Sequence, residues 1–208
     1  MISEEYEKLT QRCYVYNICH FDNIKSILQN GLLSYYHASS INHVSIANPE
    51  IQDRRDKKKV PNGLALHQYV NCFFNPRNSM LYSNSSFDNI AILCISNKVL
   101  DLPGVVVSDK NAAKNTVAFY GAQMGIDKLN FKEIFLSNWD SPDPWEKERL
   151  KAILHAEVLV PFKIESSYIK EIRVAKESVK RKLHTLLSNY IRIEVDSYMF
   201  FDREDSND

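Results

Sequence analysis

Apolar and polar residues follow a helical spacing in several stretches of the chain. In the segment DNIKSILQNG, Ile24, Ile27 and Leu28 fall on one face of a helix, and Gly31 follows them as a helix-ending glycine does. In the segment NPEIQDRRDKK, Pro49 suits the first position of a helix. PWEKERLKAILHA and KESVKRKLHTLLSN also have a helical pattern. The predicted helices therefore cover residues 22–31, 48–58, 144–156 and 176–189.

Runs of β-branched and aromatic residues separate these segments and predict strands. The predicted strands are Tyr14–Cys19, Tyr69–Asn75, Asn89–Ser96, Gly104–Ser108, Glu157–Pro161, 168–175 and 190–195. Strands and helices mix without a regular strand–helix–strand repeat, which favours an α+β fold over a doubly wound sheet. No G-x-G-x-x-G follows a strand and no Walker A loop is present, so Rossmann and P-loop sites are excluded.

Composition predicts one globular domain over residues 1–208, because 44% of the 208 residues are hydrophobic and 25% are charged. The polar, acidic tail FDREDSND, residues 201–208, is expected to be frayed. No apolar run approaches the length of a membrane span, and the start MISEEYEK does not have the pattern of a signal peptide. We therefore expect a cytoplasmic protein without a membrane partner.

The cysteines show no spacing typical of a metal site or of a disulfide framework. Cys13, Cys19, Cys72 and Cys94 are scattered, with no C-x-x-C and no nearby histidine pair. We interpret them as reduced thiols with packing roles, and we expect no metal cofactor.

Basic residues gather in two blocks, although the formal net charge is +0. The first runs from Arg54 to Lys59, and the second, at 176–182, is interpreted as a solvated face. Arg54 and Arg55 are adjacent on a predicted helix, so their side chains diverge by roughly 100° and one of them can face a cleft. From the pattern alone, a solvated basic face is the alternative for the first block as well.

Glu157 is the candidate for chemistry, because it begins a strand that continues as the apolar run VLVP. A buried carboxylate is unfavourable unless something pairs with it, and the alternative is a glutamate exposed at a sheet edge. His67, in LHQYV, is interpreted as a packed loop residue, and no G-x-S-x-G motif supports a serine triad. The segment NSMLY, Asn78 to Tyr82, fits either the core or a surface that stacks on bases.

Three segments then occur in a specific order: YNICHFDNIKSILQNGLL, SIANPEIQDRRDKKKVPNGLALHQYVNCFFNPRNSMLY and KAILHAEVLVP. In order and spacing they resemble the DarT family, bacterial ADP-ribosyltransferase toxins that modify nucleobases in single-stranded DNA. The resemblance is dense over the first part of the chain and patchy near Glu157. It implies an α+β, ADP-ribosyltransferase-like split β-sheet with an NAD cleft. It also implies a neutralising partner, such as a DarG-like macrodomain antitoxin.

The resemblance also implies roles for individual residues. Arg55 and Glu157 match the family's catalytic arginine and glutamate. The expected NAD-binding residues are Asn17, Ile18, Cys19, Ser26 and Arg55. The expected contacts to single-stranded nucleic acid come from cations that can follow a phosphate backbone and from side chains that can stack on bases: Arg54, Lys57, Lys58, Lys59, Met80 and Tyr82.

The sequence departs from the family pattern at the positions of a His, a Thr and a later His, where it has Asn17, Cys19 and Thr116. These changes leave open which base is modified and whether the strand is DNA. The first alternative is the same chemistry on RNA, as messenger-RNA modification in phage defence. The second is a catalytically inactive nucleic-acid-binding relative. Modification of protein is disfavoured, because the resemblance includes the nucleic-acid segment.

Overall fold

An eight-stranded sheet forms the centre of the molecule, with the strand order β10-β9-β4-β1-β3-β7-β5-β6. The computed structural model describes residues 1–84, 88–187 and 191–201. The strands of this sheet are β1 (Tyr14–His20), β3 (Tyr69–Phe73), β4 (Ile90–Ser96), β5 (Val106–Ser108), β6 (Phe119–Gly121), β7 (Glu157–Pro161), β9 (Ile169–Val174) and β10 (Arg192–Val195). A second, two-stranded sheet pairs β2 (Leu32–Leu33) with β8 (Lys163–Ile164). Neighbouring strands are antiparallel except β9 and β10, which are parallel.

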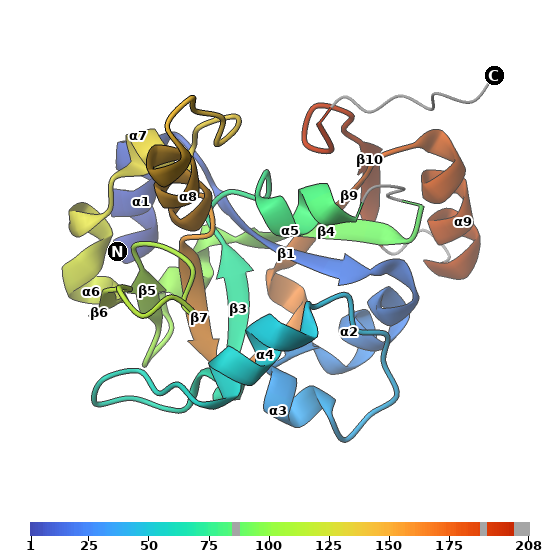
Figure 1. The fold of residues 1–208 in the computed structure, drawn as a ribbon. Helices are drawn as coiled ribbons and strands as arrows, with labels where there is room; N and C mark the ends of the chain where they lie inside the picture. The colour runs from blue at the N-terminus through green and yellow to red at the C-terminus, as the bar shows by residue number, and fades with distance from the viewer. Residues whose placement is uncertain (85–87, 188–190, 202–208) are drawn as a thin grey trace.

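The sheet divides into two halves between β1 and β3. β1 is in register with β4 from Tyr14 to His20, but with β3 it is in register at the single pair Tyr16–Phe73. Beyond that pair the two strands no longer form a ladder along the described residues. β10, β9, β4 and β1 therefore form one half-sheet, and β3, β7, β5 and β6 form the other (Figure 1). This arrangement agrees with the split sheet that the family resemblance implies.

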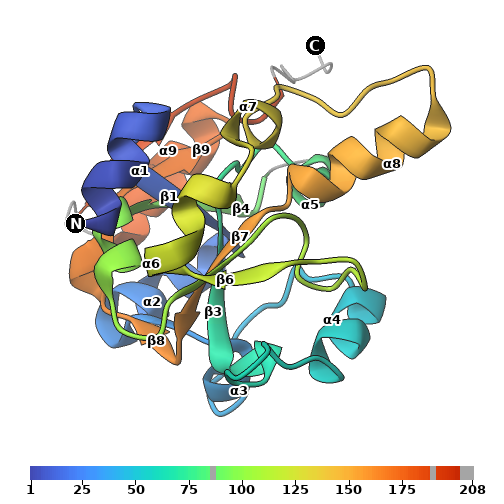
Figure 2. The same ribbon diagram turned by 90° about the vertical axis from the view of Figure 1, so that its left-hand side faces the viewer.

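Helices cover both faces of the sheet. The helices are α1 (Ile2–Thr10), α2 (Ile24–Asn30), α3 (Tyr35–Ala38), α4 (Pro49–Asp56), α5 (Ser79–Ser83), α6 (Ala122–Gly125), α7 (Phe131–Ile134), α8 (Pro144–Ile153) and α9 (Glu177–Leu187). Short 3₁₀ turns lie at Phe21–Asn23, Leu66–Gln68, Asn97–Asp101, Ile126–Lys128 and Ser166–Tyr168. α1, α2 and α9 pack on one face through buried residues such as Tyr6, Ile24 and Leu183. Figure 2 shows α1 and α9 on one side of the sheet and α4 and α8 on the other.

Strand periodicity decides which residues reach the face under α4 and α8. Successive side chains of a strand point to opposite faces. In β7, Val158 and Val160 enter the large core with α1 and α2, so Glu157 points the other way. Tyr16 and Phe73 belong to a smaller core on that opposite face. The carboxylate therefore lies beside the point where the sheet divides.

Local sequence explains how the elements around the site begin and end. Asn48 caps α4 by accepting from the Glu50 and Ile51 N–H groups, with Pro49 in the first turn. Gly31 ends α2 with φ +82°, and a Cβ there would lie 2.7 Å from the Ile164 carbonyl oxygen, so this turn requires glycine.

The predicted elements agree with the structure within a few residues, and the strand Glu157–Pro161 has the predicted bounds. The predicted helix at 144–156 ends earlier, at Ile153, and the strand at Gly104–Ser108 begins later, at Val106. The structure also contains α1, α3, α5, α6, α7, β2, β6 and β8, which the sequence patterns did not predict. Residues 188–190 and 202–208, which carry parts of a predicted helix, a predicted strand and the predicted frayed tail, lie outside the described residues.

Candidate active site

Glu157 and Arg55 form a buried ion pair at the start of β7. Arg55 lies in the last turn of α4, and its Nη1 is 3.0 Å from both Oε1 and Oε2 of Glu157. The Arg55 side chain is 8% exposed and the Glu157 side chain is 1% exposed. The exposed-edge alternative for Glu157 is therefore wrong, because the carboxylate is enclosed and paired. Arg54, the neighbouring residue, is exposed, so the two arginines diverge as the helical spacing predicts.

The loop between β5 and β6, residues 109–118, completes the surroundings of Glu157. The Ala112 N–H donates to Glu157 Oε1 at 2.8 Å. The Glu157 N–H donates to Ser108 Oγ at 3.1 Å, and the Ser108 hydroxyl donates to the Lys110 carbonyl at 2.7 Å. Oε1 thus has donors from two elements, Arg55 and the Ala112 N–H, whereas Oε2 accepts from Arg55. Because a carboxylate oxygen can accept two hydrogen bonds, Oε2 can take a further donor from a ligand.

A cleft of about 670 Å³ opens beside this pair, between the diverging strands and under α4, α5 and α8. Such a volume is in the range of small-molecule and cofactor sites. The predicted site residues that line it are Asn17, Ile18, Cys19, Ser26, Arg54, Arg55, Met80 and Glu157. The structure therefore brings the predicted NAD-binding segment and the predicted catalytic pair to the same cleft.

Asn17 connects the two half-sheets where their ladder ends. Its Nδ2 donates to the Asn71 carbonyl of β3 at 2.9 Å, one residue beyond the Tyr16–Phe73 pair. The side chain is buried, yet it lines the cleft. An amide has a second N–H and an acceptor oxygen, which stay available to a ligand. Asn17 can therefore hold the strands in place and contact a ligand at the same time.

His155 and Ser79 form a polar wall of the cleft that the sequence analysis did not identify. His155 Nδ1 is 2.9 Å from the Lys151 carbonyl, and Nε2 is 3.5 Å from Ser79 Oγ. Burial lowers the pKa of His155 to about 4; the hydrogen bond to the Lys151 carbonyl opposes this shift, and the Lys151 and Lys114 cations contribute to it. Because a carbonyl only accepts, Nδ1 carries the proton and Nε2 is an acceptor. His155 lies two residues before Glu157 in the sequence, and this closeness to the candidate catalytic residue could have marked His155 as a residue of the cleft.

The predicted nucleic-acid residues occupy different surroundings. Arg54 and Met80 line the cleft, whereas Lys57 and Lys59 are exposed outside it. Lys58 is instead half-buried, and its ammonium group donates to main-chain carbonyls of the loop 109–118.

Tyr82 turns away from the cleft. Its ring lies 5.5 Å from the ring of Trp139 and 5.2 Å from that of Phe201, both edge-on. Thr116 is exposed and does not line the cleft. His67 is half-buried beside α4, 3.1 Å from the Gln52 side-chain oxygen, which agrees with a packed residue. Burial, followed by the charge of Arg55, lowers the pKa of His67.

The remaining predictions concern thiols, metals and membranes. All four cysteines are free, and burial raises the pKa of Cys19 in the cleft to about 12. Within residues 1–84, 88–187 and 191–201, no cluster of His, Cys, Asp or Glu side chains is arranged to hold a metal ion. Among the helices described, none has the length and apolar character needed to cross a membrane.

Comparison with known sequences identifies relatives over most of the chain. The sequence model of a family described as ssDNA thymidine ADP-ribosyltransferase, DarT, matches residues 16–201. A DNA ADP-ribosyl transferase from Thermus sp. (strain 2.9) is 30% identical over 189 residues, which cover 85% of this chain and 88% of that protein. A DNA ADP-ribosyl transferase–DNA ADP-ribosyl glycohydrolase fusion protein from Thermosipho africanus (strain H17ap60334) is 28% identical over 181 residues. This match covers 84% of the chain but 46% of the fusion protein, so the chain spans about half of that relative.

Solved structures resemble this fold over nearly the whole chain. Thermus sp. 2.9 DarT in complex with ADP-ribosylated ssDNA superposes with a TM-score of 0.79 at 28% identity, covering 91% of this chain and 96% of that one. The same Thermus protein in complex with NAD+ gives a TM-score of 0.74 at 27% identity, covering 90% of this chain and 96% of that one. The likeness therefore extends over the fold as a whole and is not confined to one motif.

Proposed function

Because this chain belongs to the DarT family of single-stranded-DNA thymidine ADP-ribosyltransferases, we propose that it transfers ADP-ribose from NAD to thymidine in single-stranded DNA. The buried Arg55–Glu157 pair at the division of the sheet is the observation that carries the proposal. The NAD+ and ADP-ribosylated ssDNA complexes of the Thermus relative support both substrates.

Glu157 acts on the donor. Cleavage of the bond between nicotinamide and ribose passes through an oxocarbenium-like state, as glycoside cleavage does. The ribose 2′-hydroxyl donates to Oε2 of Glu157, and this hydrogen bond strengthens as positive charge develops on the ring. The interaction is stronger in the transition state than in the bound substrate, which is the condition for acceleration. The Ala112 N–H and Arg55 hold the carboxylate in one orientation for this contact.

NAD occupies the cleft between the half-sheets. Asn17, Ile18 and Cys19 on β1 form one wall, and Ser26 on α2 continues it. The nicotinamide end lies toward Glu157, because the bond that breaks must be near the carboxylate. No metal takes part in this scheme, since the Arg55 cation provides the positive charge beside the reacting groups.

Arg55 acts on the acceptor as well as on the donor. In thymidine the ring nitrogen that still carries a proton is N3, because N1 bears the sugar. Attack by that nitrogen on C1′ of the ribose forms the new bond, nicotinamide leaves with the electron pair of the old one, and the N3 proton is released to solvent. A guanidinium is a poor general base, so Arg55 lowers the energy of the developing anion on the base electrostatically.

A single strand suits this site because its bases are unpaired. N3 of thymine is engaged in pairing within a duplex, and exposing it takes a few kcal/mol. Arg54, Lys57 and Lys59 are exposed cations beside the cleft that can contact the phosphate backbone. Met80 offers an apolar contact at the cleft wall, and the Tyr82 ring, which lies outside the cleft, is 45% exposed and can stack on a base there.

In the cell this activity is that of a toxin with a partner that reverses it. The Thermosipho fusion protein joins a transferase to a DNA ADP-ribosyl glycohydrolase, which supports a DarG-like macrodomain antitoxin as the partner here. We place the reaction in the cytoplasm, where NAD and replicating DNA coexist, and phage DNA replication is a process that the modification would block.

The test uses purified protein, labelled NAD and oligonucleotides in matched forms. Each oligonucleotide is a homopolymer interrupted by one other base, prepared as single-stranded DNA, single-stranded RNA and duplex DNA. We expect the mass of one ADP-ribose on thymidine-containing single-stranded DNA, located by fragmentation, and little on the duplex. Labelling confined to RNA would replace DNA with RNA as the substrate. Absence of labelling with NAD still bound would leave the inactive-relative alternative.

A further inference from the structure

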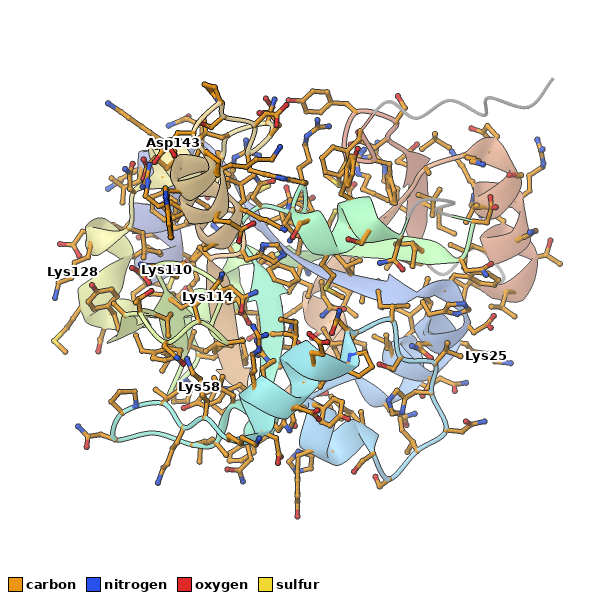
Figure 3. All side chains as sticks on the ribbon, viewed as in Figure 1. Lys25, Lys58, Lys110, Lys114, Lys128 and Asp143 are labelled. Carbon is orange, nitrogen blue, oxygen red and sulfur yellow. The ribbon has the colours of Figure 1, made fainter. Side chains whose placement is uncertain are left out.

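The ammonium group of Lys58 is attached to the loop that contacts Glu157. Its Nζ donates to the Ala112 carbonyl at 3.4 Å and to the Lys114 carbonyl. The pKa of Lys58 is lowered by burial and then by the nearby Arg55 charge. Lys58 is half-buried, whereas Lys57 and Lys59 on either side are exposed. Figure 3 shows Lys58 below Lys114 on the same side of the molecule, and the Lys58 ammonium group donates to the Lys114 carbonyl.

Ala112 is held from both of its main-chain groups. Its carbonyl accepts from Lys58, and its N–H donates to Glu157 Oε1 at 2.8 Å. The residue is fully buried, and Asn111 next to it donates its N–H to the Ala152 carbonyl of α8 at 2.9 Å. The turn at 111–114 is thus fixed between α4, α8 and the carboxylate.

The segment 55–58 therefore holds the Glu157 carboxylate through two sets of contacts. Arg55 contacts Glu157 directly, and Lys58, three residues later, contacts it through Ala112. The Lys58 N–H also donates to the Arg55 carbonyl at 3.0 Å, which continues the helical turn. A change at Lys58 would release the loop without removing any group that touches Glu157.

We propose that Lys58 is a positioning residue, whose ammonium group pins the 111–114 turn so that the Ala112 N–H keeps Glu157 Oε1 in its catalytic orientation. This inference rests on the proposed function for its effect on rate, but not for its effect on the loop. It gives Lys58 a different role from Lys57 and Lys59, although the three form one basic run in the sequence.

The test replaces each lysine separately, as Lys57→Met, Lys58→Met and Lys59→Met, which remove the charge but keep an unbranched side chain. In Lys58→Met we expect the rate at saturating NAD and oligonucleotide to fall on the order of 10- to 100-fold, as small misplacements of catalytic groups do. Oligonucleotide affinity and its salt dependence should stay as in the wild type. Lys58→Arg should recover part of the rate, because a guanidinium also donates to two carbonyls.

The two neighbours are matched controls. Lys57→Met and Lys59→Met should weaken oligonucleotide binding, each reducing the slope of log K against log salt by about 1, and should leave the exchange rate of the Ala112 amide as in the wild type. A Lys58→Met variant that loses oligonucleotide affinity while its rate at saturation equals that of the wild type would make Lys58 a nucleic-acid contact and overturn the proposal.

Hydrogen exchange supplies a readout that does not need the DNA reaction. The Ala112 amide should exchange faster in Lys58→Met than in the wild type, while amides of β4 in the core keep their protection. Unchanged exchange at Ala112 would overturn the proposal whatever the activity shows. If the wild type labels no DNA at all, the proposed function fails, and the exchange data still decide whether Lys58 pins the loop.

Discussion

Arg55 and Glu157 are 102 residues apart in the chain, and a single guanidinium nitrogen lies 3.0 Å from both carboxylate oxygens. The pair lies where β3 and β7 meet, since Phe73 is in register with Glu157. Burying two charges carries a desolvation penalty that their attraction offsets only in part, so a buried pair is weak evidence for a stabilising role. In the proposed function both charges are enclosed because they act on the substrates in the cleft.

Replacing Glu157 by Gln should abolish transfer and leave NAD binding largely intact. Gln keeps the shape of the side chain but lacks the negative charge that stabilises the developing oxocarbenium ion. We expect a loss of at least ~100-fold in transfer rate, measured with labelled NAD, alongside calorimetric NAD binding. Glu148→Gln is the control, because Glu148 also lines the cleft but is exposed. A Glu157→Gln rate within tenfold of the wild type would remove Glu157 from the catalytic role.

Replacing the adjacent arginines should give two different defects. Arg55→Ala removes the partner of Glu157 and should eliminate transfer even at saturating NAD and oligonucleotide. Arg54→Ala removes an exposed cation and should mainly weaken oligonucleotide binding and make it less dependent on salt. Rates measured at several salt concentrations separate these effects. Equal behaviour of the two variants would mean that the assignment of the second arginine is wrong.

The sequence was sufficient for the parts of this structure that local pattern controls. Runs of β-branched and aromatic residues predicted β1, β4 and β7, and Pro49 marked the start of α4. The family resemblance added the expectation that Arg55 and Glu157 act together. Periodicity could not supply that pairing, because no local pattern relates residues so distant in the chain.

The roles of Lys58 and Tyr82 depend on tertiary packing. In sequence, Lys58 is one of three similar lysines, and only the approach of the loop 109–118 separates it from its neighbours. Tyr82 follows Met80 by two residues, so a short helix turns the two side chains in different directions. Met80 consequently lines the cleft while Tyr82 packs against Trp139.

Acidification should destabilise the protein through His155. Its pKa in the folded state is about 4, below the ordinary value of 6.5, because it is buried without a carboxylate partner. As pH falls through 6.5 the unfolded chain binds a proton that the folded chain does not, so the free energy of unfolding falls until about pH 4. The expected loss is about 3 kcal/mol, with stability fully present above pH 6.5. Urea unfolding of the wild type and of His155→Asn between pH 7 and 4 measures this loss. If the free energy of unfolding falls equally with pH in both proteins, the assignment to His155 is contradicted.

Thiol reactivity should distinguish one cysteine from the other three. Cys13 is exposed, whereas burial raises the pKa of Cys19 and Cys94 to about 12 and also raises that of Cys72. The thiolate is the reactive form, so at pH 8 the folded protein should react quickly at Cys13 alone. A chromogenic disulfide reagent should count one fast thiol in buffer and four in denaturant. Cys13→Ser should remove the fast phase. Fast labelling of Cys19 would contradict the prediction, because it would show that the Cys19 thiol is accessible to solvent from the cleft.

Asn17 should be needed both for stability and for NAD use, because it bridges the strands where the sheet divides. Its Nδ2 donates to the Asn71 main-chain carbonyl at 2.9 Å. In Asn17→Ala that carbonyl loses its partner, and we expect the free energy of unfolding to fall by about 1 kcal/mol. The KM for NAD should rise, since the wall formed by β1 is no longer held to β3.

Asn71→Ala is the matched control: it removes a side chain but keeps the accepting carbonyl, so its stability should stay near that of the wild type. Urea unfolding and NAD titrations on both variants decide the matter, and an Asn17→Ala variant with unchanged stability and unchanged KM would show that the bridge has no role at the division of the sheet.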